Sequence, residues 1–113
     1  MVTSYIPERG DLIWLSFDPQ AGKEITKTRP ALVLSPLIYN RKTSLCLAVP
    51  ISSKIKGAPF EIELKHPALQ GVVLADQVRS LDWRARQAAL IGKVEQEFVE
   101  DVIACFSTLL EQY

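Results

Sequence analysis

The chain has 113 residues and a mass of 12.6 kDa, and its 13 basic residues balance its 13 acidic ones. We expect one domain, residues 1–113, because a chain of this length can bury a core without disulfide or metal support. It has no apolar run near the ~18 residues of a membrane span and no secretory leader, so we expect a cytoplasmic protein without membrane association.

Short apolar segments separated by polar, proline-containing turns are typical of β-strands. The predicted strands are residues 12–17, 30–34, 45–49, 60–64, 72–81 and 88–94, the fifth being long or bent. Pro30 opens the second strand, where a missing N–H costs least. Polar loops are predicted at 20–28 and 52–59.

The last segment has a different periodicity. Seven apolar residues recur at helical spacing: Phe98, Val99, Val102, Ile103, Phe106, Leu109 and Leu110. Strands come first and one amphipathic helix comes last, which favours a small barrel or sandwich with the helix packed on it.

The cysteines and the histidine give no metal-binding pattern. Cys46 and Cys105 are far apart and form no Cys-x-x-Cys pair, so both are expected to be small apolar residues. His66 is the only histidine, and a metal site normally needs several converging ligands. We therefore expect no metal and no cofactor.

The balanced charge hides an uneven distribution. Residues 25–60 contain six basic side chains and no acidic one: Lys27, Arg29, Arg41, Lys42, Lys54 and Lys56. Residues 95–113 contain five acids and no base. Arginines and lysines beside the hydroxyls of Ser52 and Ser53 can bind phosphate, which suggests a polyanionic partner. The alternative is an ordinary solvated loop surface.

Aromatic side chains could stack on unpaired bases. Phe17, at a strand end, and Trp83, among polar neighbours, are the better candidates for exposure. Trp14 lies in the middle of a strand and is expected to pack in the core.

Several segments together, in order and spacing, resemble the MazF/PemK family of toxin endoribonucleases over nearly the whole chain. They are Gly10–Trp14, Phe17–Pro19, Arg29–Ser35, Val49–Ser52, Gly71–Val78 and Asp82–Arg86. The resemblance implies a mainly β, compact antiparallel SH3-like barrel with a C-terminal α-helix, acting as a homodimer. It also implies a toxin that cleaves single-stranded RNA without metal, inhibits translation and is neutralised by a MazE-like antitoxin.

The resemblance also implies site residues. The family's arginine before proline falls on Arg29, its hydroxyl residue after Val-Pro-x on Ser52, and an acidic loop residue on Glu24. The candidates for RNA binding are Phe17, Lys54, Lys56, Gln77 and Arg86. The chain departs from many relatives at residues 25–28, where small residues are frequent in the family.

In such a mechanism the substrate 2′-hydroxyl attacks the phosphate, giving a 2′,3′-cyclic phosphate and a 5′-hydroxyl. Arg29 would stabilise the phosphorane charge and Ser52 would donate to a non-bridging oxygen. Glu24 is either the base or an ion-pair partner of its basic neighbours. Two other classes stay open: a barrel that poisons a protein target such as DNA gyrase, and a non-catalytic RNA- or protein-binding barrel.

Overall fold

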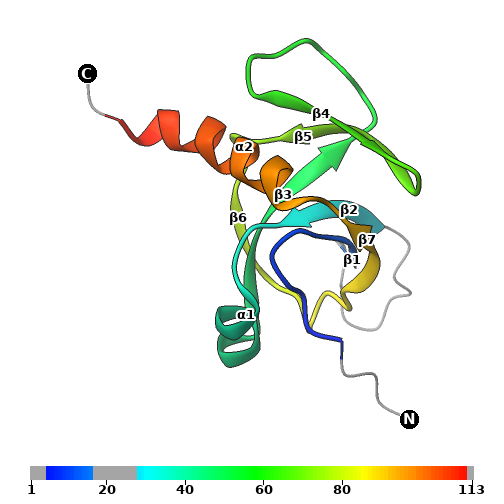
Figure 1. The fold of residues 1–113 in the computed structure, drawn as a ribbon. Helices are drawn as coiled ribbons and strands as arrows, with labels where there is room; N and C mark the ends of the chain where they lie inside the picture. Colours follow the sequence, from blue (N-terminus) through cyan, green and yellow to red (C-terminus); the bar gives the residue numbers. More distant parts are fainter. Residues whose placement is uncertain (1–4, 17–27, 112–113) are drawn as a thin grey trace.

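The computed structural model describes residues 5–16 and 28–111 (Figure 1). Its strands are β1 (Asp11–Ser16), β2 (Thr28–Val33), β3 (Leu45–Ser52), β4 (Glu61–His66), β5 (Leu69–Leu74), β6 (Arg79–Asp82) and β7 (Ala89–Lys93). Its helices are α1 (Leu37–Thr43), α2 (Gln96–Ser107) and the 3₁₀ turn Thr108–Leu110. The predicted site residues Phe17 and Glu24 lie outside the described residues.

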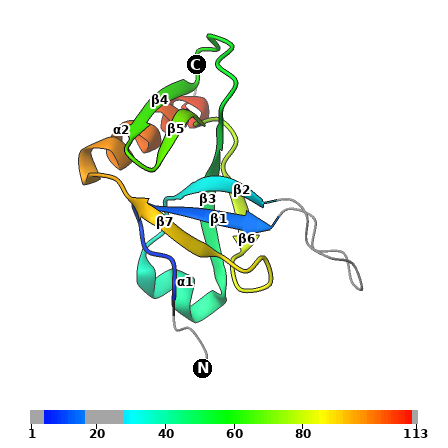
Figure 2. The ribbon, with the colours of Figure 1, turned by 90° about the vertical axis from the view of Figure 1, so that its right-hand side faces the viewer.

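The strands form one curled antiparallel sheet in the order β4-β5-β3-β2-β1-β7, and β6 also pairs with β3. Figures 1 and 2 place the β4–β5 hairpin and α1 at opposite ends of the molecule, with β3 running between them. The prediction of a mainly β, antiparallel, barrel-like fold with a C-terminal helix is confirmed.

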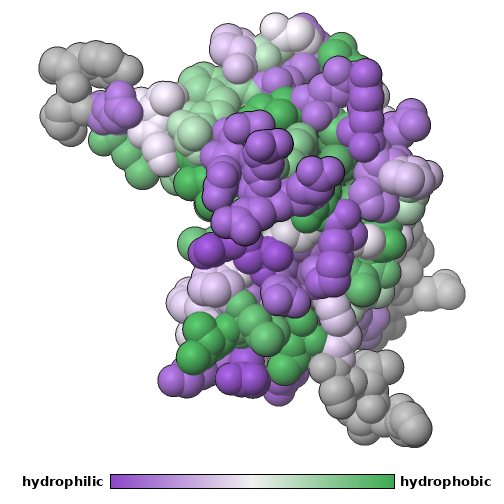
Figure 3. Space-filling model, viewed as in Figure 1, coloured by the Kyte–Doolittle hydropathy of each residue, from purple (hydrophilic) through white to green (hydrophobic). Residues whose placement is uncertain are grey.

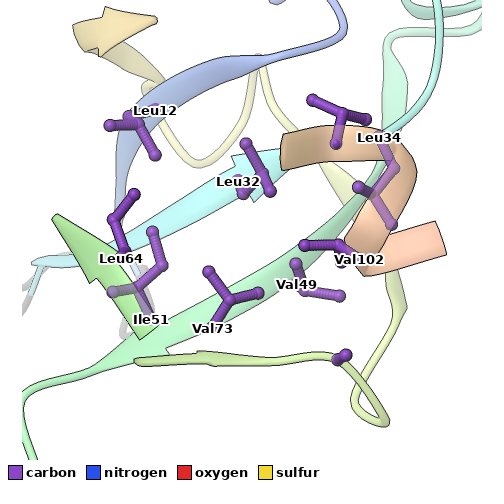
Figure 4. Packing of buried hydrophobic residues seen from close by; sticks show 10 residues of the cluster. Leu12, Leu32, Leu34, Val49, Ile51, Leu64, Val73 and Val102 are labelled. Atoms are coloured by element: carbon purple, nitrogen blue, oxygen red, sulfur yellow. The ribbon is translucent and has the colours of Figure 1, made fainter. Parts of the chain in front are cut away.

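Two apolar clusters cover the two faces of the sheet. The first packs β-strand residues such as Leu32, Val49 and Val73 against Val99 and Val102 of α2, and Figure 4 shows labelled strand side chains gathered beside the helix that carries Val102. The second gathers residues of β1, β2 and β3 under Trp83 and Tyr5. Side chains alternate along each strand, so neighbouring residues of one strand serve both clusters.

The predicted long strand 72–81 is two strands on one edge of β3. β5 pairs Val73 with Ile51, whereas β6 pairs Arg79 with Ala48. Pro50 of β3 lies opposite the interruption. The Leu47 N–H donates to the Ser35 hydroxyl on the β2 side of β3. Because N–H groups alternate between the two sides of a strand, the backbone nitrogen of Pro50 points towards the β5–β6 edge. Since proline has no N–H, the ladder has no donor there.

Helix α1 was not predicted, because its apolar residues follow no clear helical period. Its first residues, Leu37, Ile38 and Tyr39, are exposed, and the α1 end of Figure 3 is partly apolar for this reason. Its buried residue is polar: Asn40 is fully buried. The helix is held in place by hydrogen bonds to that side chain rather than by an apolar stripe.

The two tryptophans are reversed relative to the prediction. Trp83 is 4% exposed, and its Nε1 donates to the Asn40 carbonyl at 2.9 Å. Trp14 is 38% exposed, although it lies in the middle of β1. The sequence neighbours predicted the wrong exposure for both residues. The indole of Trp83 is buried because it has a hydrogen-bond partner that is distant in sequence.

Candidate functional site

The strands β2 and β3 separate at one end of the sheet. Their pairing runs from Val33↔Ala48 to Ala31↔Pro50 and stops there. The Leu34 N–H donates to the Leu47 carbonyl at 2.8 Å. Because backbone N–H groups alternate between the two sides of a strand, the nitrogens of Leu32 and Pro30 also point towards β3. The nitrogen of Pro30 carries no hydrogen. The next hydrogen-bonded pair cannot form, and the strands diverge.

A hollow of about 650 Å³ lies at this divergence. Its walls come from the start of β2, the end of β3, both ends of β5 and the chain leading into β6. The polar residues that line it are Thr28, Arg29, Ser52, Ser53, Lys54, Gln70, Gln77 and Arg79. Of the predicted site residues, the fold thus brings together Arg29, Ser52, Lys54 and Gln77, which are up to 48 positions apart in sequence.

The electrostatics of the hollow favour an anion. Among the described residues, Arg29, Lys54 and Arg79 line it and no carboxylate does. Arg29 is exposed, and the described part of the chain offers its guanidinium no hydrogen bond or ion pair. A guanidinium with free donors in a concave wall can take two oxygens of a phosphate at once.

Ser52 is the last residue of β3 and is half-buried. Its Oγ accepts a hydrogen bond of 3.0 Å from the Lys54 N–H, so the hydroxyl orders the turn that follows the strand. Its own proton has only a 3.5 Å contact, to the Lys54 carbonyl. The hydroxyl can therefore be redirected to an oxygen of a ligand without breaking a strong bond.

Two predicted RNA-binding residues lie away from the hollow. Lys56 is in the exposed loop after β3, where its backbone N–H donates to the Glu61 carboxylate. The guanidinium of Arg86 donates to the Ser16 carbonyl at 3.0 Å and so braces the end of β1. Neither side chain lines the walls around Arg29.

The basic stretch 25–60 is also divided by the fold. Arg41 and Lys42 lie in the last turn of α1, beside the start of β3, whereas Ser52 is the last residue of that eight-residue strand. These two basic residues therefore do not lie beside Ser52, although they belong to the same basic stretch of the sequence. They are separated from Ser52 by roughly 20 Å of extended chain.

Sequence reasoning missed Trp14, Gln70 and Arg79 as residues of the hollow. Trp14 is placed there by its pairing with Pro30, the residue that ends the β2–β3 ladder. The sequence carries no local signal for this placement, because the pairing joins residues of two different strands.

The sulfur and imidazole groups take no part in this hollow. Cys46 is fully buried, and burial raises the pKa of its thiol to about 12. His66 packs over Gly92 of β7, with its Nδ1 accepting from the Ala68 N–H. Within residues 5–16 and 28–111 there is no group of three or more His, Cys, Asp or Glu residues that could hold a metal. None of the helices in these ranges is long and apolar enough to cross a membrane.

Comparison with known proteins identifies the family. The model of the PemK-like, MazF-like toxins of type II toxin-antitoxin systems matches residues 8–110. The chain belongs to the MazF/PemK toxin family. It is 48% identical over 110 residues to the endoribonuclease toxin MazF of Escherichia coli strain K12, covering 97% of this chain and 99% of that protein.

Other members of the MazF/PemK family agree. The endoribonuclease PemK of Escherichia coli is 35% identical over 108 residues, covering 91% of this chain and 81% of that protein. A MazE–MazF crystal structure from Deinococcus radiodurans superposes with a TM-score of 0.85 at 41% identity, covering 97% of this chain and all of that one. The fold described above is therefore the fold of MazF.

Proposed function

We propose that this MazF-family chain is a sequence-specific endoribonuclease toxin of a type II toxin-antitoxin system. It cleaves single-stranded RNA without a metal ion, leaves 2′,3′-cyclic phosphate and 5′-hydroxyl ends, and so inhibits translation. The observation that carries this proposal is the cationic hollow between β2 and β3. Arg29 and Ser52 both line it, and no carboxylate of the described residues does.

Arg29 is assigned to the charge that develops on phosphorus. The guanidinium remains protonated at neutral pH and can hold two phosphate oxygens as they become more negative in the transition state. It can also give a proton to the leaving 5′-oxygen. Ser52 donates its loosely held hydroxyl proton to a non-bridging oxygen.

The general base must take the proton of the 2′-hydroxyl. The described walls hold no carboxylate or histidine for this role. Glu24 is our candidate. Its position in the sequence, shortly before Arg29 at the start of β2, would bring a carboxylate to the same end of the sheet.

The RNA strand is proposed to run along the hollow and its rims. Lys54 meets a phosphate, Gln77 reads a base edge and the exposed indole of Trp14 provides a stacking surface. Phe17, Lys56 and Arg86 are assigned to nucleotides that flank the cleaved bond.

The same proposal includes partners. The chain would act in the cytoplasm as a homodimer and be neutralised by a MazE-like antitoxin. The MazE–MazF crystal structures from Deinococcus radiodurans support the antitoxin as a partner. The antitoxin segment that covers the hollow should be acidic, because the described walls are cationic.

The proposal is tested with a defined single-stranded RNA in buffer containing EDTA. Wild-type protein should cut it at one short sequence, and the new 5′ ends should need phosphorylation before ligation. Arg29→Ala should lose about a hundredfold or more in rate, the usual effect of one transition-state donor. Arg41→Ala is the matched control, because it removes an exposed arginine at the other end of β3.

The outcomes separate the classes. Undiminished cleavage by Arg29→Ala would remove Arg29 from the mechanism. Absence of cleavage by the wild type on any RNA, together with inhibition of DNA gyrase, would replace the nuclease with a protein-poisoning toxin. The relatives named as endoribonucleases favour RNA cleavage by the wild-type protein.

A further inference from the structure

The strand β5 approaches the end of β3 unusually closely at Gly71. Val72 pairs with Ser52, and Gly71 lies beside this pair. A Cβ atom on Gly71 would lie 2.4 Å from the Ser52 carbonyl oxygen and 3.1 Å from the Ser52 carbonyl carbon. It would also lie 3.5 Å from Cγ2 of Ile51.

The first two contacts are with main-chain atoms, so no side-chain rotation could relieve them. A residue other than glycine at position 71 must push the β3 and β5 backbones apart. The φ angle of Gly71 is 155°, which side-chain-bearing residues also rarely adopt. The crowding and the backbone angle therefore both require glycine here.

At this position Ser52 depends on β5 for its place. β2 has already separated from β3, since its last pair with that strand is Ala31↔Pro50. Of the strands in the described ranges, β5 alone pairs with Ser52. Beyond Ser52 the chain enters a turn held by the Ser52 hydroxyl itself. A shift of β5 is thus transmitted directly to the Ser52 backbone and to its Oγ.

We propose that Gly71 is a positioning residue for the RNA-cleavage reaction. Because Gly71 has no side chain, β5 can approach the end of β3 closely and hold it in place. In this position the Ser52 hydroxyl would face the bound phosphate next to Arg29. Gly71 itself touches no substrate. This inference rests on the proposed function, because it acts through the role assigned to Ser52.

The expected effect is on the chemical step. Misplacement of a catalytic group by about 1 Å can cost on the order of a hundredfold in rate. Gly71→Ala should therefore lower kcat by roughly ten- to a hundredfold. KM should change by less than about threefold, because Arg29 and Gln77 line the walls from other segments of the chain.

Two controls remove general effects of the substitution. Gly57→Ala adds a methyl group at another positive-φ glycine, of +76°, but with no atom within 4 Å, so it tests backbone strain without crowding. Val73→Ala shortens a fully buried side chain of the same strand and lowers stability without pressing on Ser52. Both should keep kcat within about threefold of wild type when assayed well below their melting temperatures.

A double-mutant cycle with Ser52→Ala gives the decisive readout. If Gly71 acts through Ser52, Gly71→Ala should cost little further activity in a Ser52→Ala background. Two independent losses that multiply, or a kcat loss in Gly71→Ala no larger than in Val73→Ala, would overturn the inference. Should Gly71→Ala not fold, Val72→Gly loosens the same pairing without adding an atom. A folded Val72→Gly protein with wild-type kcat would equally overturn it.

The failure of the proposed function looks different. If the wild-type protein cleaves no RNA, the nuclease assignment fails before any variant is compared. If the wild type cleaves and Gly71→Ala cleaves equally well with the same KM, the positioning role alone is refuted.

Discussion

The two ends of the β1–β2–β3 sheet differ in whether their polar side chains are hydrogen-bonded within the protein. At one end, where β1 begins and β2 finishes, Asp11, Ser35 and Asn40 are buried and hydrogen-bonded. At the other end, Arg29 is exposed with no partner in the described part of the chain. The buried Ser16 hydroxyl at that end also has no partner there. We call these the closed end and the open end.

The closed end is held by a network of buried hydrogen bonds around Asn40. The Asn40 amide donates to the carbonyls of Pro7 and Ser35, and its oxygen accepts from the Ser35 hydroxyl. That hydroxyl in turn accepts from the Leu47 N–H. The buried side-chain hydrogen bonds of the described residues lie at the closed end, whereas the open end keeps unpaired donors that a ligand can use.

Asn40→Ala should be the most destabilising change at the closed end. It leaves the carbonyls of Pro7 and Ser35 without the Asn40 donor and the Ser35 hydroxyl without its acceptor, and each such loss costs about 1 kcal/mol or more. We expect a loss of about 3 kcal/mol in the free energy of unfolding, measured by urea denaturation. Lys42→Ala, an exposed neighbour on α1, should change it by less than about 0.5 kcal/mol.

The same variant tests the separation of the two ends. While Asn40→Ala remains folded, its kcat for RNA should stay within about threefold of wild type, because the hollow lies at the far end of β3. A large kcat loss in the folded variant would show that the ends are coupled.

Trp14→Ala should have a smaller effect, and at the open end. Removing a stacking surface costs about 1–2 kcal/mol in single-stranded RNA binding, so KM should rise about five- to thirtyfold with kcat nearly unchanged. Trp14→Phe should recover most of the loss. Leu90→Ala, an exposed apolar residue of the neighbouring strand β7, should leave KM unchanged. Equal KM values for Trp14→Ala and wild type would remove the indole from the RNA path.

Sequence reasoning predicted the strands well because their cues are local. Ser35 follows the end of β2, and alternation in residues 60–64 is visible without a structure. The predicted boundaries at Pro30 and Pro50 are wrong, because β2 begins at Thr28 and β3 continues to Ser52. Sequence reasoning also placed Arg29 and Ser52 in one site through the family resemblance, and the fold brings both to one hollow.

The failures come from contacts between residues distant in sequence. Helix α1 is fixed by bonds from Asn40 to Pro7 and from Trp83 to Asn40, and no window of the sequence contains them together. The hydrogen bond from the Trp83 indole to the Asn40 carbonyl also keeps Trp83 buried, although its polar sequence neighbours predicted exposure. The break between β5 and β6 depends on Pro50 in a different strand.

The smallest predicted effect concerns the closed end at high pH. The Tyr5 hydroxyl donates to Asp11 at 2.6 Å, and burial together with this carboxylate raises the pKa of Tyr5. Its hydrogen bond to Asp11 likewise raises the pKa of Lys93. Both groups keep their protons in the folded state at a pH where the unfolded chain loses them, so their stabilisation is complete below about pH 10 and falls above it.

Tyr5→Phe should therefore flatten the loss of stability at alkaline pH. One proton that is retained only in the folded state gives a slope of at most about 1.4 kcal/mol per pH unit. Between pH 9 and pH 11 the wild type should lose roughly 1 kcal/mol more than Tyr5→Phe in urea unfolding, while the contribution of Lys93 persists in both proteins. The other tyrosines are common to both proteins and cancel in the difference. Parallel stability profiles would mean that Asp11 holds the closed end through Lys93 and the Glu8 N–H without help from the phenol.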